Sequence, residues 1–266
     1  MSAPMEPVPG VFPIRLPRPA PLVPGVLVKR YKRFLADIEL ESGEVITAHC
    51  VNTGAMEGLT RPGIRVWVSR ASNPARKLVW TWEMAEVDGR VYGVDTSAPN
   101  RLVGHLLRER LLPELCDYDE MAPERRYAGG QRRADFWMRR GGRELWVEVK
   151  NCHLVYPDGC AYFPDCVSQR ASAHMEELTA LVESGQVDAW VIFVVQVEGA
   201  RMVRPSDVHD PAFARTARQA WKAGVRFLGL RVVQTPGETV IEDLLPVDLE
   251  PYPTAEIEQW HAEALR

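Results

Sequence analysis

The segment "DFWMRRGGRELWVEVK" (135–150) constrains the fold of this chain more than any other, because it fits one β-hairpin in one register. Gly141-Gly142 can form the two central residues of a tight turn, since glycine tolerates the positive φ angles that such turns need. Counted outward from this turn, apolar residues oppose apolar residues, and an arginine opposes a glutamate with which we expect an ion pair. The predicted opposed pairs are Arg139–Glu144, Met138–Leu145, Trp137–Trp146, Phe136–Val147 and, at the open end, Asp135–Glu148.

The open end of this hairpin is predicted to bring two carboxylates together. Opposed residues of antiparallel strands have Cβ atoms roughly 4.5–5.5 Å apart, and two carboxylates that close repel each other unless a proton or a cation lies between them. Lys150 shares the face of Glu148, because strand side chains alternate with period two. The arrangement indicates a divalent-metal site. The alternative is a structural ion pair between Lys150 and Asp135.

Composition and the cysteines indicate an ordinary globular protein. The chain has 266 residues, 46% of them hydrophobic and 26% charged. No apolar run reaches the roughly 18–20 residues of a membrane span, and residues 1–25 lack the basic start and apolar core of a signal peptide. We therefore expect a cytoplasmic protein with no membrane partner. Five cysteines without C-x-x-C spacing favour reduced thiols over disulfides or a zinc knuckle.

Basic residues are concentrated in two segments, although the net charge is −4. "KRYKR" supplies Lys29, Arg30, Lys32 and Arg33, and residues 124–143 contain seven arginines. Such clusters can neutralise phosphates even on a protein of negative net charge. The alternative is that they are only solvated faces.

The chain divides into three parts. Residues 1–25 are rich in proline and are expected to form an extended, poorly ordered leader. Residues 26–95 contain five strand segments separated by Gly-, Pro- and Asn-bearing breaks, which favours a five-stranded OB-like β-barrel. In this interpretation "VLVKRYKRFLADIEL" (26–40) is one long bent strand. Trp80 and Trp82 alternate on one strand and are assigned to the barrel core.

From residue 96 to 266 the pattern changes to that of an α/β domain. "NRLVGHLLRERLLPEL" has leucines at helical spacing, and the hairpin follows it. "SQRASAHMEELTALVESG" and "DPAFARTARQAWKAG" are predicted helices, while "DAWVIFVVQVEG" and "VRFLGLRVV" are predicted core strands, the second of them the last. This order predicts a mixed sheet covered by helices.

The spacing of Asp135, Glu148 and Lys150 is the pattern of the PD-(D/E)xK nuclease superfamily. The residues after the leader also resemble the sugar fermentation stimulation protein A family. The resemblance rests on "RYKRFLAD", "HCVNTGAMEGL", "SNPARKLVWTWE", "GVDTSAPN", "RRADF", "VEVKN", "FPD" and "QR". It implies an N-terminal OB-like domain, a C-terminal PD-(D/E)xK nuclease-like domain and binding to DNA, with RNA as an alternative.

The resemblance also implies roles for individual residues. Asp135 and Glu148 match the metal-binding carboxylates, Lys150 matches the catalytic lysine, and Glu124 matches an acid that completes the site. The implied cofactor is Mg²⁺ or Mn²⁺. Matching positions for nucleic-acid contact are Asn52, Thr53, Asn73, Arg76, Lys77, Arg133 and Arg170, beside Lys29, Arg30, Lys32 and Arg33. The sequence departs from the family pattern at Val51, at Asp95 and in "ASAH" after Arg170, where a glycine and a lysine are usual.

Three function classes follow. The first is a metal-dependent nuclease that hydrolyses phosphodiester bonds. The second is a non-catalytic DNA-binding regulator of sugar (maltose) metabolism genes. The third is a sugar-binding protein, for which no polar and aromatic pocket is evident. His174 and Gln196 are further candidates for a place near the site.

Overall fold

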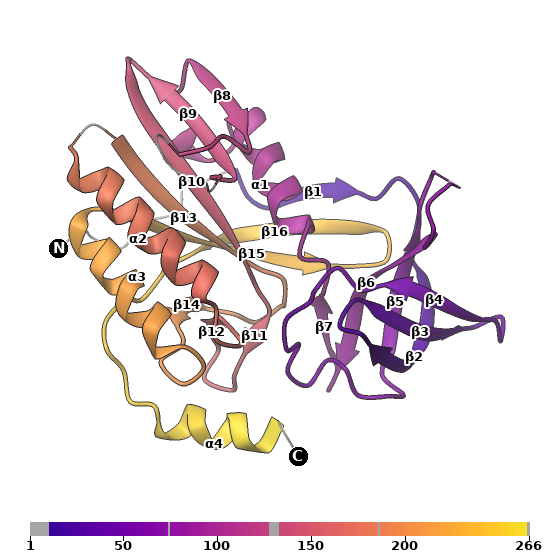
Figure 1. The fold of residues 1–266 in the computed structure, drawn as a ribbon. Coiled ribbons are helices and arrows are strands. Elements are labelled where there is room, and N and C mark those ends of the chain that lie inside the picture. Colours follow the sequence, from indigo (N-terminus) through magenta and orange to yellow (C-terminus); the bar gives the residue numbers. More distant parts are fainter. Residues whose placement is uncertain (1–10, 74, 128–132, 186, 265–266) are drawn as a thin grey trace.

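The computed structural model describes residues 11–264 apart from 74, 128–132 and 186. It consists of a β-barrel beside an α/β domain (Figure 1). This architecture confirms the fold class predicted from the sequence. In the described part of the chain, no helix has the length and apolar character needed to cross a membrane.

The barrel consists of five strands, β2 to β6, that close on themselves through pairing of β4 with β6. A sixth strand, β7, pairs with β6. Trp82 is completely buried in the barrel core, as expected, and Trp80 packs against that core. The strands are β2 (Val23–Tyr31), β3 (Leu35–Leu40), β4 (Val45–His49), β5 (Arg65–Arg70), β6 (Trp80–Val87) and β7 (Arg90–Gly93).

Residues 26–40 form a hairpin of β2 and β3, so the expectation of one bent strand was wrong. The turn is made by Lys32 and Arg33, which adopt φ angles of 50° and 66°. Left-handed backbone usually selects glycine, asparagine or aspartate. With lysine and arginine in these positions, the turn has no recognisable signal in the sequence.

The α/β domain is built on a seven-stranded mixed sheet in the order β1-β16-β15-β13-β10-β9-β8. β10, β13 and β15 are parallel neighbours at its centre, and the outer pairs are antiparallel. Its strands are β1 (Ile14–Pro17), β8 (Glu120–Pro123), β9 (Phe136–Arg140), β10 (Arg143–Cys152), β13 (Val187–Val195), β15 (Arg226–Gln234) and β16 (Glu238–Leu245).

Helices cover both faces of this sheet because β10 is apolar on both sides. Val147 and Val149 share a core with the leucines of α1, whereas Trp146 shares a core with residues of α2 and α3 (Figure 1). A small sheet and a terminal helix complete the domain. These elements are α1 (Ala98–Arg108), η1 (Pro113–Leu115), β11 (Leu154–Val155), β12 (Cys160–Phe163), α2 (Gln169–Glu183), β14 (Met202–Pro205), α3 (Pro211–Ala223) and α4 (Ala255–Ala264).

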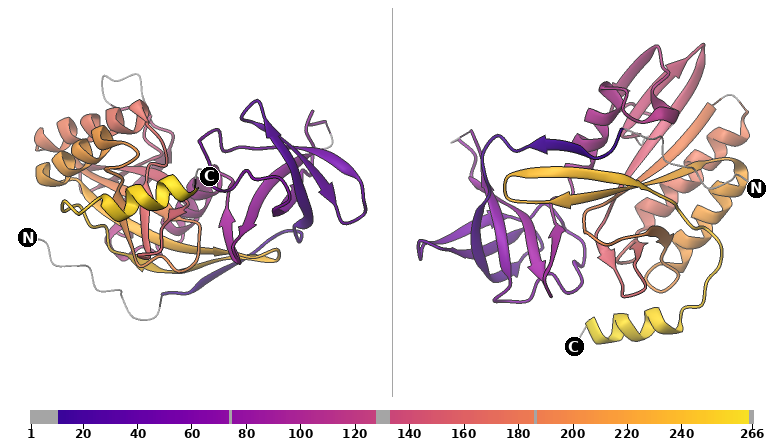
Figure 2. Two further views of the ribbon diagram at one scale, coloured as in Figure 1. Left: turned by 90° about the horizontal axis from the view of Figure 1, so that it is seen from below. Right: turned by 180° about the vertical axis from the view of Figure 1, so that it is seen from behind.

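Part of the expected leader belongs to the folded protein. Residues Ile14–Pro17 form β1, which pairs antiparallel with β16 at the edge of the large sheet (Figure 2). The sequence analysis also missed β16, which follows the strand taken as the last. Proline at Pro17 is compatible with this place, since an edge strand does not need every N–H for pairing. The barrel itself starts at Val23, before the expected residue 26.

Candidate active site

The hairpin of β9 and β10 has the predicted register for the four pairs from Arg139–Glu144 to Phe136–Val147, whereas the predicted Asp135–Glu148 pair lies outside the ladder. Arg139 opposes Glu144, Trp137 opposes Trp146 and Phe136 opposes Val147, with Gly141 and Gly142 at φ angles of 53° and 84° in the turn. A second detail differs from the expectation. Arg139 forms its ion pair with Glu120 of β8 rather than with Glu144, because β8 lies on the other side of β9 and places Glu120 opposite Arg139.

Asp135 immediately precedes β9, and hydrogen bonds hold both of its carboxylate oxygens. Oδ1 accepts a 2.6 Å hydrogen bond from Nδ2 of Asn100 on α1, and Oδ2 accepts a 2.7 Å bond from the backbone N–H of Val149. The second bond joins Asp135 to the residue between Glu148 and Lys150. The hairpin and α1 together therefore fix the direction of this carboxylate.

Glu148 lies at the centre of a buried polar cluster. Nζ of Lys150 donates to its Oε1 over 2.5 Å, and Nδ1 of His174 on α2 contacts the same oxygen. Within the described residues, the second oxygen, Oε2, is buried and has no hydrogen-bond partner. The alternative of an ion pair between Lys150 and Asp135 is replaced by one between Lys150 and Glu148, which lie on the same face of β10.

The two carboxylates have opposite pKa shifts. Burial and the neighbouring charge of Glu148 raise the pKa of Asp135 from 3.8 to about 6. Burial also opposes ionisation of Glu148, but Lys150 and His174 outweigh it and lower the pKa of that group. Glu148 is thus charged throughout the neutral range. Asp135 gains its charge only near neutrality, at a position where a cation would stabilise that charge.

Glu124 lies beside Asp135, since its backbone N–H donates to the carbonyl oxygen of Asp135 over 3.0 Å. Its side chain is exposed, and its backbone has a φ angle of 54°. The structure therefore brings the chain at Glu124 to the candidate site. A role of the Glu124 carboxylate in metal binding remains a prediction.

The "KRYKR" cluster is divided between structural and exposed residues. Arg30 donates from Nη2 to the carbonyl oxygens of Arg33, Asn52 and Gly54 over 2.9–3.0 Å, and Arg33 donates from Nε to the carbonyl of Thr53 over 2.8 Å. Both arginines thus attach the β2–β3 hairpin to the loop after β4.

The other two basic residues of this cluster face solvent. Nζ of Lys29 is 3.4 Å from Oδ2 of Asp37, and Lys32 is exposed at the turn. These two remain the members of the cluster best placed to meet a partner.

The other predicted contact residues also differ in exposure. Asn52 is buried, and its Oδ1 accepts from the N–H of Gly54 over 2.8 Å, so this side chain shapes the loop. Thr53, Asn73, Arg76, Lys77, Arg133 and Arg170 are all exposed. Arg170 lies in the first turn of α2, the helix that also carries His174.

Two contacts of the site were not assigned from the sequence. Asn100 lies in the motif "GVDTSAPN", but its bond to Asp135 depends on how α1 packs. His174 was a candidate without a partner, and the structure brings it to Glu148.

Gln196 lies elsewhere: its side chain bonds to Asn151, to Gln234 and to the carbonyl of Asp95, so it links the α/β domain to the barrel.

A closed OB-like barrel joined to an α/β domain with a mixed sheet defines a class of two-domain proteins. Sequence profiles identify both parts. Residues 28–94 match "SfsA N-terminal OB domain" and residues 97–238 match "Sugar fermentation stimulation protein RE domain". The chain belongs to the sugar fermentation stimulation protein family, SfsA, which confirms the resemblance seen in the sequence.

Relatives match most of the chain. The "Sugar fermentation stimulation protein homolog" of Methylobacterium sp. is 46% identical over 233 residues, 86% of this chain and 96% of the relative. That of Geobacter metallireducens is 43% identical and covers 87% and 99%. A solved structure, SfsA of Pyrococcus furiosus in complex with Ca²⁺, has a TM-score of 0.80 at 25% identity and covers 88% of this chain and 99% of its own.

Proposed function

We propose that this protein is a divalent-cation-dependent nuclease that hydrolyses phosphodiester bonds at the β9–β10 hairpin. One observation carries the proposal: a hydrogen bond from the N–H of Val149 holds Asp135 against the strand segment that carries the buried, paired side chains of Glu148 and Lys150. A hydrolytic site of this kind needs carboxylates for a metal and a cation for the phosphate or the attacking water.

The residues present fit Mg²⁺ or Mn²⁺. Both ions prefer oxygen ligands, and Mg²⁺ is commonly bound through one or two carboxylates while it keeps several waters. Asp135 and Glu148 would hold the ion, and the unpartnered Oε2 of Glu148 is a free ligand atom among the described residues. The P. furiosus relative was solved in complex with Ca²⁺, which supports a divalent cation here.

When bound, such an ion polarises the scissile phosphate and lowers the pKa of a bound water. The other residues act around it. Lys150 is placed to orient that water or to balance charge on the phosphate, and it also keeps Glu148 ionised. His174 contacts the same oxygen of Glu148 as Lys150 does, and Asn100 fixes the direction of Asp135.

Nucleic acid is the proposed substrate, DNA first and RNA as the alternative. The OB description of the barrel supports it, since OB folds commonly bind oligonucleotides. Exposed basic residues lie on both domains: Lys29, Lys32, Arg76 and Lys77 on the barrel, and Arg133 and Arg170 near the candidate site. We propose that these residues contact the phosphate backbone.

A second candidate function is a DNA-binding regulator without cleavage. The name of the relatives, which refers to stimulation of sugar fermentation, favours it. In this case the barrel and the arginines would bind DNA, and the hairpin would serve as scaffold. Salt-sensitive DNA binding is common to both functions, so only cation-dependent cleavage separates them.

The test combines cleavage with melting temperature. Labelled single- and double-stranded DNA and RNA are incubated with the protein, with and without Mn²⁺ or Mg²⁺. The Tm is measured with the same ions, because a ligand that binds only the folded state raises it. We expect cleavage and a rise in Tm for the parent, and neither for Glu148→Ala, although Glu148→Ala should still bind nucleic acid.

Two further variants separate the roles. Lys150→Ala should lose cleavage and keep the cation-induced rise in Tm, because the lysine acts on water or phosphate. Glu144→Ala, in the same strand but outside the polar cluster, should behave as the parent. A parent whose Tm is indifferent to both ions and which cuts none of the nucleic acids would refute the nuclease. Retained, salt-sensitive binding would then favour the regulator.

A further inference from the structure

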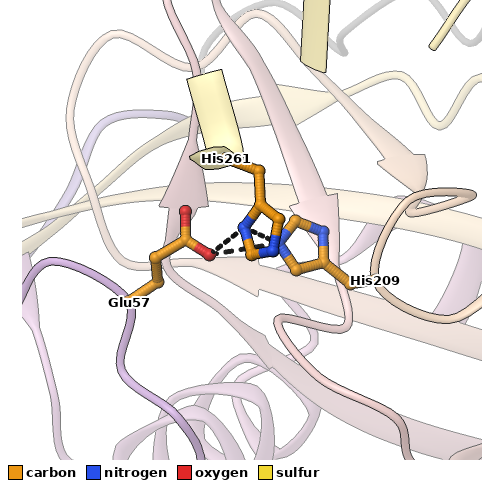
Figure 3. Close-up of side chains that lie close together, drawn as sticks. All are labelled: Glu57, His209 and His261. Atoms are coloured by element: carbon orange, nitrogen blue, oxygen red, sulfur yellow. Dashed lines mark hydrogen bonds and ion pairs between the residues drawn. The ribbon is translucent and has the colours of Figure 1, made fainter. Parts of the chain in front are cut away.

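Three side chains from separate parts of the chain converge at a second place, as Figure 3 shows. Glu57 lies in the barrel loop between β4 and β5, His209 lies in the segment before α3, and His261 lies on α4. Oε2 of Glu57 is 2.6 Å from Nδ1 of His261 and 3.2 Å from Nε2 of His209. The two imidazole nitrogens are 3.1 Å apart.

The neighbours of this triad fix its side chains. The hydroxyl of Tyr156 donates to Oε1 of Glu57 over 2.9 Å, which leaves Oε2 directed at the histidines. Oγ of Ser206 is 2.7 Å from Nδ1 of His209. When His209 carries its proton on Nδ1, Nδ1–H can donate a hydrogen bond to Oγ of Ser206, and Nε2 then presents a lone pair to the other two groups. Such supporting bonds are typical of metal-binding histidines.

We propose that Glu57, His209 and His261 bind a zinc ion. Two imidazole nitrogens and one carboxylate oxygen are a donor set that suits Zn²⁺ better than Mg²⁺ or Ca²⁺. Zn–N and Zn–O bonds of about 2.0–2.2 Å in a tetrahedron put ligand atoms about 3.3–3.6 Å apart. Two of the three separations, 3.1 and 3.2 Å, are already close to this value, whereas Oε2 of Glu57 and Nδ1 of His261, 2.6 Å apart, must separate by roughly 0.7–1 Å.

The exposure of the three side chains indicates from which side solvent would reach the ion. The side chains of Glu57 and His209 are 4% and 3% exposed, whereas that of His261 is 31% exposed. The protein supplies three ligands here, so a fourth position is left for water on the side of His261.

The site would connect three parts of the molecule. It would join the barrel loop, the α/β domain and the C-terminal helix α4, whose Ile257 packs against Tyr156 and Tyr162. His261 lies beyond residues 97–238, which match the RE-domain profile. The site is separate from the β9–β10 hairpin, where the proposed metal ligands are the two carboxylates Asp135 and Glu148.

The test uses the full chain after treatment with a chelator. Zn²⁺ is added in the presence of a chromophoric competitor, the bound metal is counted after gel filtration, and the electronic spectrum is recorded with Co²⁺ instead. We expect one Zn²⁺ per chain, a Tm that rises with Zn²⁺ concentration and a Co²⁺ spectrum of low coordination number. Zn²⁺ should also slow proteolysis of α4.

Variants decide whether the triad binds the ion. His261→Ala, on a terminal helix, should fold normally and weaken Zn²⁺ binding by roughly 100-fold or more. Glu57→Gln should weaken it as well. His105→Ala on α1, outside both sites, should bind as the parent does. The proposal is wrong if the parent takes up no Zn²⁺, or if its affinity is unchanged in both His261→Ala and Glu57→Gln. Neither result bears on the nuclease site.

Discussion

Glu148 organises the candidate active site through one oxygen and leaves the other available. Oε1 of Glu148 accepts a hydrogen bond from Nζ of Lys150 and contacts His174. Oε2 is buried and has no hydrogen-bond partner among the described residues. The pKa of Asp135 is raised, whereas that of Glu148 is lowered, so the Asp135 carboxyl becomes charged only near neutral pH. Two carboxylates with different pKa values at one place are typical of functional sites.

Asp135 should reduce the stability of the metal-free protein at neutral pH. Its pKa is about 6 in the folded protein and near 3.8 in the unfolded chain, so the folded state holds the proton more tightly. The contribution of Asp135 to the free energy of unfolding is therefore fully present below pH 3.8 and is lost as the pH rises through 6. With a chelator present, Asp135→Asn should be more stable than the parent by about 1–3 kcal/mol at pH 8, and the gain should vanish toward pH 4.

Urea denaturation between pH 4 and pH 8 measures this difference. Asp117→Asn, which changes an exposed carboxylate, is the control and should stay within about 0.5 kcal/mol of the parent. If Asp135→Asn had the same effect at every pH, the raised pKa of Asp135 would be excluded.

The sequence predicted the candidate carboxylates and lysine but not all the residues that contact them. The acid and Glu-x-Lys at the ends of one hairpin follow from a register that local pairing determines. Asn100 and His174 reach the same site from two helices on opposite faces of the sheet. Their contacts depend on helix packing, which has no local signal in the sequence.

Turn chemistry explains why one hairpin was predicted and another was not. The Gly141-Gly142 dipeptide predicts a tight turn from the sequence, whereas Lys32 and Arg33 adopt positive φ angles although neither is glycine. The β2–β3 hairpin is instead held by side chains, because Arg30 and Arg33 donate to carbonyls of the loop after β4. β1 was missed for a related reason: an edge strand in a proline-rich segment resembles a linker until its partner is known.

The two kinds of basic residue in this hairpin should respond differently to substitution. Arg30→Ala removes the donor shared by three carbonyl oxygens and should cost about 1.5–3 kcal/mol of unfolding free energy, since bonds from charged donors are among the stronger ones. Lys32→Ala changes an exposed side chain and should stay within about 0.5 kcal/mol.

Urea denaturation measures both values, and filter binding at several salt concentrations measures nucleic-acid affinity. We expect weaker binding for Lys32→Ala with unchanged stability. Equal stability of the two variants would contradict the structural role of Arg30, and unchanged affinity of Lys32→Ala would remove this turn from the interface.

For the whole molecule, the contact between the domains depends on a glycine. The backbone N–H of Gly93 donates to the carbonyl of Gln196 over 2.8 Å, and Tyr92 pairs with Val197 across the domains. A Cβ atom at Gly93 would lie 2.7 Å from Oε1 of Gln196. The amide of Gln196 is itself fixed by Asn151 and Gln234, so it cannot move freely.

Gly93→Ala should therefore loosen the interface between the domains. We expect a loss of about 1–3 kcal/mol, the usual cost of overpacking a tight site. Calorimetry should then show a broader transition or two transitions where the parent shows one. Gly237→Ala is the control, because a Cβ atom added there would have no neighbour within 4 Å among the described residues. A single transition at the parent's Tm would show that the domains do not depend on this contact.

The pairing of β1 with β16 makes the barrel an insertion rather than an N-terminal module. β1 lies in the large sheet from Ile14, after which the chain leaves this sheet to form the barrel and returns to the α/β domain at α1. Two covalent connections therefore hold the barrel, and a domain held at two points cannot swivel as one on a single linker can. A nucleic acid bound on the barrel would have a fixed direction toward the hairpin. During synthesis, moreover, β1 must wait for β16, so the barrel can fold on the ribosome before the sheet that carries it is complete.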